Sequence, residues 1–239
     1  MTARPTVFVV DADVSVRESL ELLIDRSGWQ PKAFASAKEF LAHPRVPAPS
    51  CMVLDVALPG LSGLDLQKLV ADRTDMPIIF LTGSGDVAMT VQAMKAGAVE
   101  FLTKPFRADV LVSAIREALE RSWRAMAREA ALKSLRDSYA SLSRREREVM
   151  ELVVSGLLNK QVGGELGISE ITVKAHRGQV MRKMHADSLP ALVKMAARLD
   201  LPAGRPAEPV FQAPWPEAAS GRSPRAPDTS RASAFRASA

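Results

Sequence analysis

Four apolar segments in the first half of the chain each end in a residue whose side chain can do chemistry. Two of them end in the carboxylates of Asp11 and Asp55. Two later segments end in the hydroxyl of Thr82 and the amine of Lys104. Because ligands bind at the carboxyl ends of strands in open parallel sheets, we expect these side chains to share one site. Taken singly, each also has an ordinary interpretation, such as a loop acid or a surface lysine.

Short strands that alternate with helices must position these side chains. Apolar runs bounded by turn residues predict strands at residues 6–10, 33–34, 51–55, 76–82 and 99–104. Serines with capping-box spacing predict helix starts at Ser15 and Ser36, Ser62 caps a third helix, and a fourth spans residues 86–96. Five strands alternating with five helices predict an α/β fold with a doubly wound parallel sheet.

Residues 106–140 contain no glycine or proline and predict one long helix. Its apolar residues lie at near-heptad spacing, at Leu119, Trp123, Met126 and Ala130, and then at Leu135 and Tyr139. About two heptads are regular, fewer than the three or four that argue for a coiled coil. Two interpretations stay open: an amphipathic linker packed on a neighbouring element, and a helix that pairs with a second chain.

Residues 141–199 predict four short helices and therefore an all-α unit. Their boundaries are marked by Ser143 with Glu146, Asn159, Gly167, Ser169, and Ser188 with Pro190. The last segment, residues 202–239, is dominated by alanine, proline, serine and arginine, and it is predicted to be disordered.

Composition points to a folded protein of roughly two domains, with 239 residues, 47 % hydrophobic and 25 % charged. The single cysteine, Cys51, excludes an internal disulfide. No apolar run is long enough for a membrane helix and no leader opens the chain, so we expect a cytoplasmic protein without membrane contact. The net charge of +5 is concentrated in residues 122–199. This favours nucleic-acid contact there, although a solvated basic face is the alternative.

The first domain resembles the receiver domain of bacterial two-component response regulators over residues 5–120. The residues that carry the resemblance are Asp11, Asp55, Pro59, Gly60, Ser62, Gly63, Thr82, Gly83, Phe101, Lys104 and Pro105. The resemblance implies a five-stranded flavodoxin-like fold. It also implies that Asp55 is the phosphoacceptor, forming an acyl phosphate with a phosphoryl group from a sensor histidine kinase.

The same resemblance assigns roles to three further residues. Lys104 would supply a cation to a phosphate oxygen, and Thr82 a hydroxyl that moves toward the phosphate. Phe101 would swing inward when Thr82 moves and alter the surface formed by residues 86–96 and 99–103. This would be a two-state switch biased by a local charge. Phe101 has the alternative of being an ordinary core aromatic.

The resemblance also implies a Mg²⁺ site formed by Asp11, Asp55 and the backbone of Ala57. The family usually has two adjacent acids after the first strand, but this chain has Ala12 where the second acid belongs. Asp13 is a candidate substitute whose side chain need not point the same way. Because Mg²⁺ demands near-octahedral oxygen ligands, we expect weakened Mg²⁺ affinity and slower phosphorylation than in an Ala12→Asp variant.

Two alternatives for the first domain follow from the same residues. Asp11 and Asp13 resemble the first motif of haloacid-dehalogenase-type phosphatases, in which Asp11 would be the nucleophile; no acidic pair follows Lys104 at a further strand end. The second alternative is a receiver that acts as a phosphorylation-independent interaction module, which the Ala12 departure favours. Phosphate on Asp55, on Asp11 or on neither distinguishes the three hypotheses.

The second segment resembles the LuxR-type helix-turn-helix of FixJ/NarL-type regulators. The matching runs are residues 142–149, 156–160, 166–169 and 172–177. Residues 170–184 would be the recognition helix in the major groove. The DNA-binding candidates are Thr172, Lys174, His176, Arg177, Arg182 and Lys183, of which Lys174 and Arg177 are expected to reach bases or phosphates. Ala175 is smaller than the apolar residue usual at its position.

The whole chain is therefore interpreted as a FixJ/NarL-type response regulator and not an enzyme. The expected domains are a receiver at residues 1–121, a helical linker at 122–140, the helix-turn-helix domain at 141–201 and the tail at 202–239. A homodimer formed through residues 86–96 and 99–103 is implied by the resemblance. Such a dimer would bind double-stranded DNA at an inverted repeat.

Overall fold

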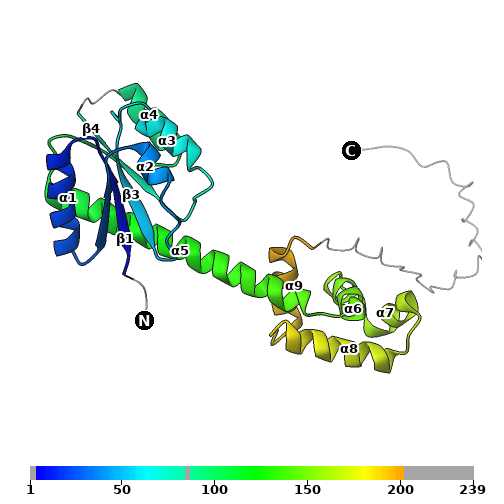
Figure 1. Cartoon of the computed structure of the whole chain (residues 1–239). Helices are drawn as coiled ribbons and strands as arrows, with labels where there is room; N and C mark the ends of the chain where they lie inside the picture. Colours follow the sequence, from blue (N-terminus) through cyan, green and yellow to red (C-terminus); the bar gives the residue numbers. More distant parts are fainter. Residues whose placement is uncertain (1–3, 84–86, 202–239) are drawn as a thin grey trace, which may run out of the picture. The chain divides into compact units, whose positions relative to one another are not determined.

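A computed structural model describes residues 4–83 and 87–201 of the chain (Figure 1). The expected helix start at residue 86 and the expected disordered tail at residues 202–239 lie outside the described residues. Within them, none of the helices is both long and apolar enough to cross a lipid bilayer.

The first domain is built on five parallel strands in the order β2-β1-β3-β4-β5. The strands are β1 (Thr6–Val10), β2 (Gln30–Phe34), β3 (Ser50–Asp55), β4 (Ile78–Thr82) and β5 (Glu100–Thr103). The helices between and after them are α1 (Val14–Arg26), α2 (Ala37–Leu41), α3 (Gly63–Leu69), α4 (Val87–Lys95) and α5 (Ala108–Ala140). This confirms the predicted doubly wound sheet. The strand order reverses between β1 and β3, which is where such sheets bind ligands.

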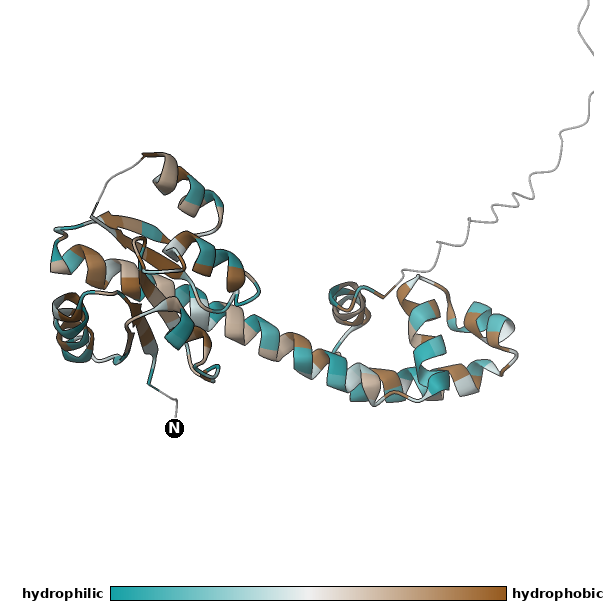
Figure 2. Cartoon of the chain, turned by 45° about the horizontal axis from the view of Figure 1, so that its top comes forward, coloured by the Kyte–Doolittle hydropathy of each residue, from teal (hydrophilic) through white to brown (hydrophobic). Residues whose placement is uncertain are grey.

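Helices cover both faces of the sheet, so the inner strands β1, β3 and β4 are apolar along almost their whole length (Figure 2). One face packs against Leu20 and Ile24 of α1 and against Leu111 and Ile115 of α5. The other face packs against residues of α2, α3 and α4, among them Phe40, Leu66 and Ala93. Because strands β1, β3 and β4 are buried on both faces, their polar end residues stand out against an apolar background.

One predicted helix start is wrong. The helix α1 begins at Val14, and its N-cap is Asp13 instead of Ser15. The Asp13 carboxylate accepts hydrogen bonds from the backbone N–H groups of Ser15, at 2.8 Å, and Val16. Aspartate is as good an N-cap as serine, and here it satisfies two of the donors that a helix start leaves unpaired.

The long helix α5 packs at both of its ends. Leu119 belongs to the core of the first domain, and Leu135 and Tyr139 belong to a hydrophobic cluster of the second. Between them Trp123 is exposed, with 61 % of its surface accessible. Ser122 is fully buried and its hydroxyl accepts a 2.9 Å hydrogen bond from the Ser50 N–H, so residue 122 is still part of the first domain's packing.

The second domain consists of the predicted four helices. They are α6 (Arg144–Val154), α7 (Asn159–Leu166), α8 (Glu170–Lys183) and α9 (Leu189–Arg198). The capping box of Ser143 and Glu146 is confirmed, and so are the Ser169 and Ser188 caps. Val173 and Val180 of α8 are buried in two apolar clusters, which leaves the opposite side of α8 facing solvent.

Candidate functional site

Asp11, Asp55 and Lys104 meet at the carboxyl ends of β1, β3 and β5. The Lys104 ammonium donates a 2.7 Å hydrogen bond to the Asp11 carboxylate and lies 3.4 Å from the Asp55 carboxylate. Asp11 is 2 % exposed and Asp55 8 % exposed, so both charges are largely withdrawn from water. One cation therefore neutralises part of the charge of two buried acids.

This arrangement affects the proton affinity of the lysine. Burial opposes the charged ammonium, but the hydrogen bond and negative charge of Asp11, followed by Asp55, outweigh burial and raise the pKa of Lys104 above its usual value. Lys104 is thus a fixed positive charge at the sheet edge. Its backbone N–H donates a 2.7 Å hydrogen bond to the Thr82 carbonyl, which ties the ends of β4 and β5 together.

Thr82 and Phe101 lie on the same face of the sheet. Side chains alternate along a strand, so Thr82 shares a face with Phe80. Phe80 pairs with Phe101 across β4 and β5, and their ring centroids are 6.0 Å apart. Phe101 is half-buried and Thr82 is 3 % exposed. A movement of the Thr82 side chain would therefore change the packing on the sheet face that carries Phe101.

The loop after Asp55 is held by the start of α3. The Ala57 N–H donates a 3.3 Å hydrogen bond to the Asp55 carboxylate, and the Gly63 N–H donates one of 3.0 Å to the Val56 carbonyl. A Cβ atom on Gly63 would lie 2.3 Å from the Asp55 carbonyl oxygen. Residue 63 must therefore be glycine for α3 to approach the acid so closely.

The candidate metal ligands are fewer than the family pattern provides. The Asp13 carboxylate is used to cap α1, and Ala12 has no oxygen in its side chain. Arg17 occupies the loop backbone, with its guanidinium donating to the carbonyls of Asp11, at 2.8 Å, and Ala12, at 2.9 Å. No cluster of three or more His, Cys, Asp or Glu side chains suited to a metal occurs in the described part of the chain. The carboxylates that remain as candidate metal ligands are those of Asp11 and Asp55.

The exposed side of α8 carries the candidate DNA contacts. Lys174 and Arg182 are exposed, as is Thr172, whose hydroxyl lies 2.8 Å from that of the N-cap Ser169. Lys174 forms a 3.0 Å ion pair with Glu170 one turn earlier. Exposed pairs of this kind are weak, so Lys174 is available to a phosphate.

Two of the candidate basic residues are engaged inside the domain. Arg177 donates a 3.1 Å hydrogen bond to the Asn159 side chain of α7. Lys183 donates one of 2.7 Å to the carboxylate of Glu146, which is 6 % exposed. His176 is half-buried on the helix. These contacts hold α8 against α6 and α7, and thereby fix the angle at which the exposed side is presented.

Two residues, one near each site, were not predicted from the sequence. They are Arg17, which donates to the backbone carbonyls of Asp11 and Ala12, and Ile171 of α8, which is 80 % accessible. An arginine one helical turn into α1 gives no sign of its backbone partners. Ile171 had a usable signal, because an isoleucine beside the Ser169 cap lies two residues from the buried Val173 and so faces away from the core.

The fold and the site define a receiver domain joined to a helix-turn-helix domain. Residues 7–116 match the model of the response regulator receiver domain, and residues 140–196 match that of bacterial regulatory proteins of the luxR family. The chain belongs to the two-component response regulators with a LuxR-type DNA-binding domain, and it is a phosphorylation-gated regulator of transcription. The comparisons support neither the phosphatase nor the interaction-module alternative.

Similar proteins cover most of the chain. Nodulation protein W of Bradyrhizobium diazoefficiens is 48 % identical over 84 % of this chain and 89 % of its own length. The transcriptional regulatory protein FixJ of the same species is 41 % identical over 83 % and 97 %. The solved response regulator StyR shares 45 % identity and superposes with a TM-score of 0.73 over 82 % of this chain and all of its own.

Proposed function

We propose that Asp55 is the phosphoacceptor through which this regulator is gated. The observation that supports it is the convergence of the Asp55 and Asp11 carboxylates on the Lys104 ammonium. In the transfer, an oxygen of Asp55 forms a bond to phosphorus while the P–N bond of a kinase phosphohistidine breaks and its electron pair returns to the imidazole. Lys104 then neutralises a phosphoryl oxygen, which lowers the cost of bringing more negative charge to a buried carboxylate.

A Mg²⁺ ion fits this site as a weakly held partner. Asp11, Asp55 and the Ala57 carbonyl would hold it, since Mg²⁺ is often bound through one or two carboxylates with water and phosphate completing the shell. When bound, it would supply further positive charge to the phosphoryl oxygens. Ala12 removes the ligand that would make the binding strong, so the proposal includes low Mg²⁺ affinity and slow phosphorylation.

The proposed output of phosphorylation is a change on the α4–β5 side of the receiver. Thr82 moves toward the phosphoryl group and Phe101 follows it inward on their shared sheet face. The surface of α4 presents the apolar side chains of Val87, Val91 and Met94, with exposures of 75, 45 and 43 %. These residues follow helical spacing on one side of α4, and they support a homodimer formed there after phosphorylation.

The proposed partners are a sensor histidine kinase at the receiver and double-stranded DNA at α8, in the cytoplasm. In a dimer two α8 helices would read an inverted repeat. Lys174 and Arg182 are proposed to meet phosphates, whereas Lys183 serves to hold α8 on Glu146. The chain acts in this scheme as a regulator, with the acyl phosphate of Asp55 as its signal and no separate substrate to turn over.

The proposal is tested by phosphorylating the full-length protein with acetyl phosphate and titrating it against promoter DNA. Intact mass should show one phosphoryl group on the wild type and none on Asp55→Asn. Affinity for DNA should rise with phosphorylation only in the wild type. An Asp11→Asn variant that still takes up phosphate excludes Asp11 as the acceptor. The proposal would be contradicted if the wild type takes up no phosphate and its affinity for DNA is the same before and after acetyl phosphate treatment.

A further inference from the structure

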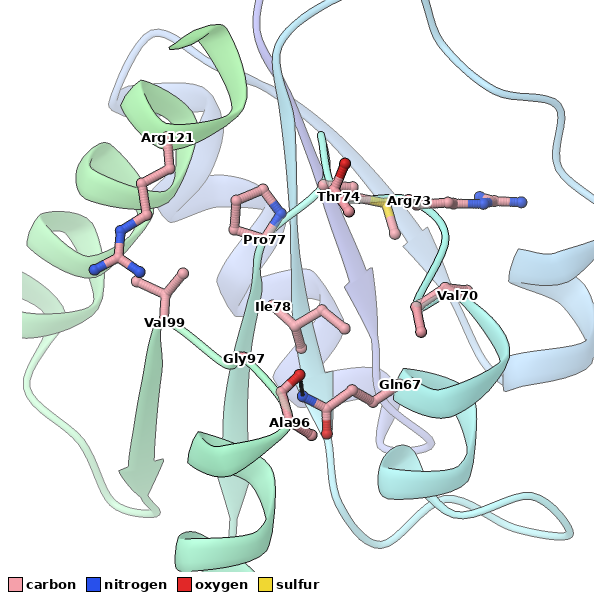
Figure 3. Close-up of a pocket in the computed structure, with 12 residues that line it drawn as sticks. Gln67, Val70, Arg73, Thr74, Pro77, Ile78, Ala96, Gly97, Val99 and Arg121 are labelled. Atoms are coloured by element: carbon pink, nitrogen blue, oxygen red, sulfur yellow. Dashed lines mark hydrogen bonds between the residues drawn. The ribbon is translucent and has the colours of Figure 1, made fainter. Parts of the chain in front are cut away.

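Gln67 is a buried polar residue to which the proposed phosphotransfer assigns no role. It lies in α3 with 5 % of its surface exposed. Its amide nitrogen donates hydrogen bonds to two carbonyls, that of Ala93 in the last turn of α4, at 3.2 Å, and that of Ala96 directly after the helix, at 3.3 Å. Figure 3 shows the bond to Ala96. Buried side-chain amides need such partners, and helix ends need donors for their last carbonyls. Gln67 thus caps a helix to which it does not belong.

The same end of α4 is already closed by its own backbone. The Gly97 N–H donates to the Met94 carbonyl at 3.0 Å, and the Ala98 N–H donates to the Ala93 carbonyl at 3.1 Å. Gly97 has φ of +92°, so this is a Schellman ending. Ala93 and Ala98 are both buried in the core cluster beside α3. The C-terminal end of α4 is therefore held in three ways. Its own backbone hydrogen bonds close it, Ala93 and Ala98 pack in the core, and the Gln67 amide donates to its carbonyls.

The apolar side chains near the start of α4 are more exposed. Its first described residue, Val87, is 75 % exposed, and Val91 is 45 % exposed. Ala93 is the buried residue of the described helix, and Met89 is a partly buried neighbour of the core. The buried residue of α4 thus lies in its last turn, and we expect local opening to begin at the other end, where Val87 and Val91 lose little apolar contact by moving.

The helix α3 connects the held end of α4 to the phosphoacceptor. Its first residue, Gly63, packs directly on the Asp55 carbonyl, and Gln67 follows one turn later. Between them Leu66 is fully buried. A seven-residue helix fixed at both positions cannot shift at one without shifting at the other. The end of α4 therefore keeps its place relative to Asp55.

From these contacts we infer that Gln67 is a positioning residue that makes the C-terminal end of α4 the pivot of the switch. The inference rests on the proposed function, because it concerns the movement that follows phosphorylation of Asp55. With the last turn held by Gln67, α4 responds by turning about that end. The side chains of Val87 and Val91 travel farthest, and the surface that changes most is the one near the start of α4.

Substitutions at Gln67 can be made without overpacking. A pocket of about 320 Å³ borders the residue, between α3, the end of α4 and the start of β4 and β5 (Figure 3). Gln67→Met keeps the length of the side chain and removes both donated hydrogen bonds. Gln92→Met, at an exposed glutamine of α4 itself, makes the same chemical change on the solvent side and is the matched control.

Hydrogen exchange of the full-length protein, resolved to single amides, tests the inference in two steps. In the unphosphorylated wild type, amides of residues 94–98 should exchange about tenfold more slowly than those of residues 88–91. Gln67→Met should remove that difference, and Gln92→Met should preserve it. Unchanged slow exchange at residues 94–98 in Gln67→Met overturns the inference, whether or not Asp55 accepts phosphate.

The second step compares protein before and after acetyl phosphate treatment, with phosphate uptake checked by mass. Phosphorylation should change exchange in residues 87–91 of the wild type while residues 94–98 keep theirs. In Gln67→Met both ends should change. Equal changes in hydrogen exchange at both ends of α4 in the phosphorylated wild type would contradict the pivot. They would not contradict phosphorylation of Asp55. Absence of phosphate uptake would count against the proposed function, while the first step still decides the role of Gln67.

Discussion

The Lys104 ammonium is closer to Asp11, at 2.7 Å, than to Asp55, at 3.4 Å. The shorter ion pair of Lys104 is therefore with Asp11, and Asp11 is not the proposed phosphoacceptor. This leaves the Asp55 carboxylate with a weaker hold on its cation and one 3.3 Å hydrogen bond from the Ala57 N–H. In this arrangement Lys104 can approach a phosphoryl oxygen on Asp55 by a small shift.

The first prediction concerns the pair formed by Lys104 and Asp11. Lys104→Met should lower the free energy of unfolding of the receiver by about 3 kcal/mol, because the buried Asp11 carboxylate would lose its cation, and the hydrogen bond that it accepts from the Asp13 N–H does not neutralise its charge. Urea unfolding followed by circular dichroism measures the effect. The double variant Asp11→Asn with Lys104→Met should recover most of the loss. If the double variant is as unstable as the lysine variant, the loss comes from packing and not from the unpaired acid.

The second prediction concerns Ala12, where the second acid is missing. Ala12→Asp should raise Mg²⁺ affinity by about tenfold, because a carboxylate is added beside Asp11 and Asp55. Isothermal titration with Mg²⁺ alone gives the affinity, and acetyl-phosphate uptake over a range of Mg²⁺ concentrations gives the rate. Ala12→Asn is the control of similar size without charge. Equal Mg²⁺ affinity in wild type and Ala12→Asp would show that the chain holds the ion by other groups.

The sequence predicted the sheet and its polar edge well, for a physical reason. Strands buried on both faces are apolar runs, so a carboxylate or an amine at the end of such a run is conspicuous. The meeting of Asp11, Asp55 and Lys104 follows from strand order, and Lys104 forms ion pairs with both acids. The Ser143–Glu146 capping box was also visible, because its partners lie three residues apart.

Contacts that depend on the exact path of the backbone, or that join distant segments, were not predictable in the same way. Ser15 had the spacing of a capping box, but Asp13 lies two residues earlier and caps the helix. The adjacent glycines of α7 differ in the same way: a Cβ on Gly163 would lie 2.8 Å from the Ile168 carbonyl oxygen, while a Cβ on Gly164 would meet open space. The bond from Gln67 to α4 crosses 26 residues of chain, and no local pattern marks it.

The third prediction follows from Glu146. Hydrogen bonds from Lys183 and then from the Ser143 N–H lower the pKa of Glu146 below its usual value. The ionised form is thus favoured in the folded state, and the resulting stability is present above the ordinary glutamate pKa and lost as the pH falls through the lowered one. Glu146→Gln should cost about 1 kcal/mol at neutral pH, since Lys183 is partly exposed, and progressively less as the pH falls through the lowered pKa of Glu146.

Urea unfolding of wild type and Glu146→Gln at several pH values between about 3 and 7 measures that difference. Glu165→Gln, at an exposed glutamate of α7, is the control and should leave stability unchanged across the series. If Glu146→Gln lowers the free energy of unfolding by the same amount at every pH, the glutamine side chain does not accept the capping hydrogen bond from the Ser143 N–H. The charge of Glu146 would then contribute little to stability.

The fourth prediction separates the basic residues of α8 by what they touch. Lys174 and Arg182 are exposed, whereas Lys183 is bound to Glu146. Binding to a short random-sequence duplex depends on released counterions, so each phosphate contact adds about one to the slope of log affinity against log salt. Lys174→Ala and Arg182→Ala should each lower that slope by about one. Lys183→Ala should weaken binding through loss of domain stability, with the slope kept. A Lys183→Ala protein of normal stability whose salt slope falls by one would place that lysine on the DNA and contradict the division made here.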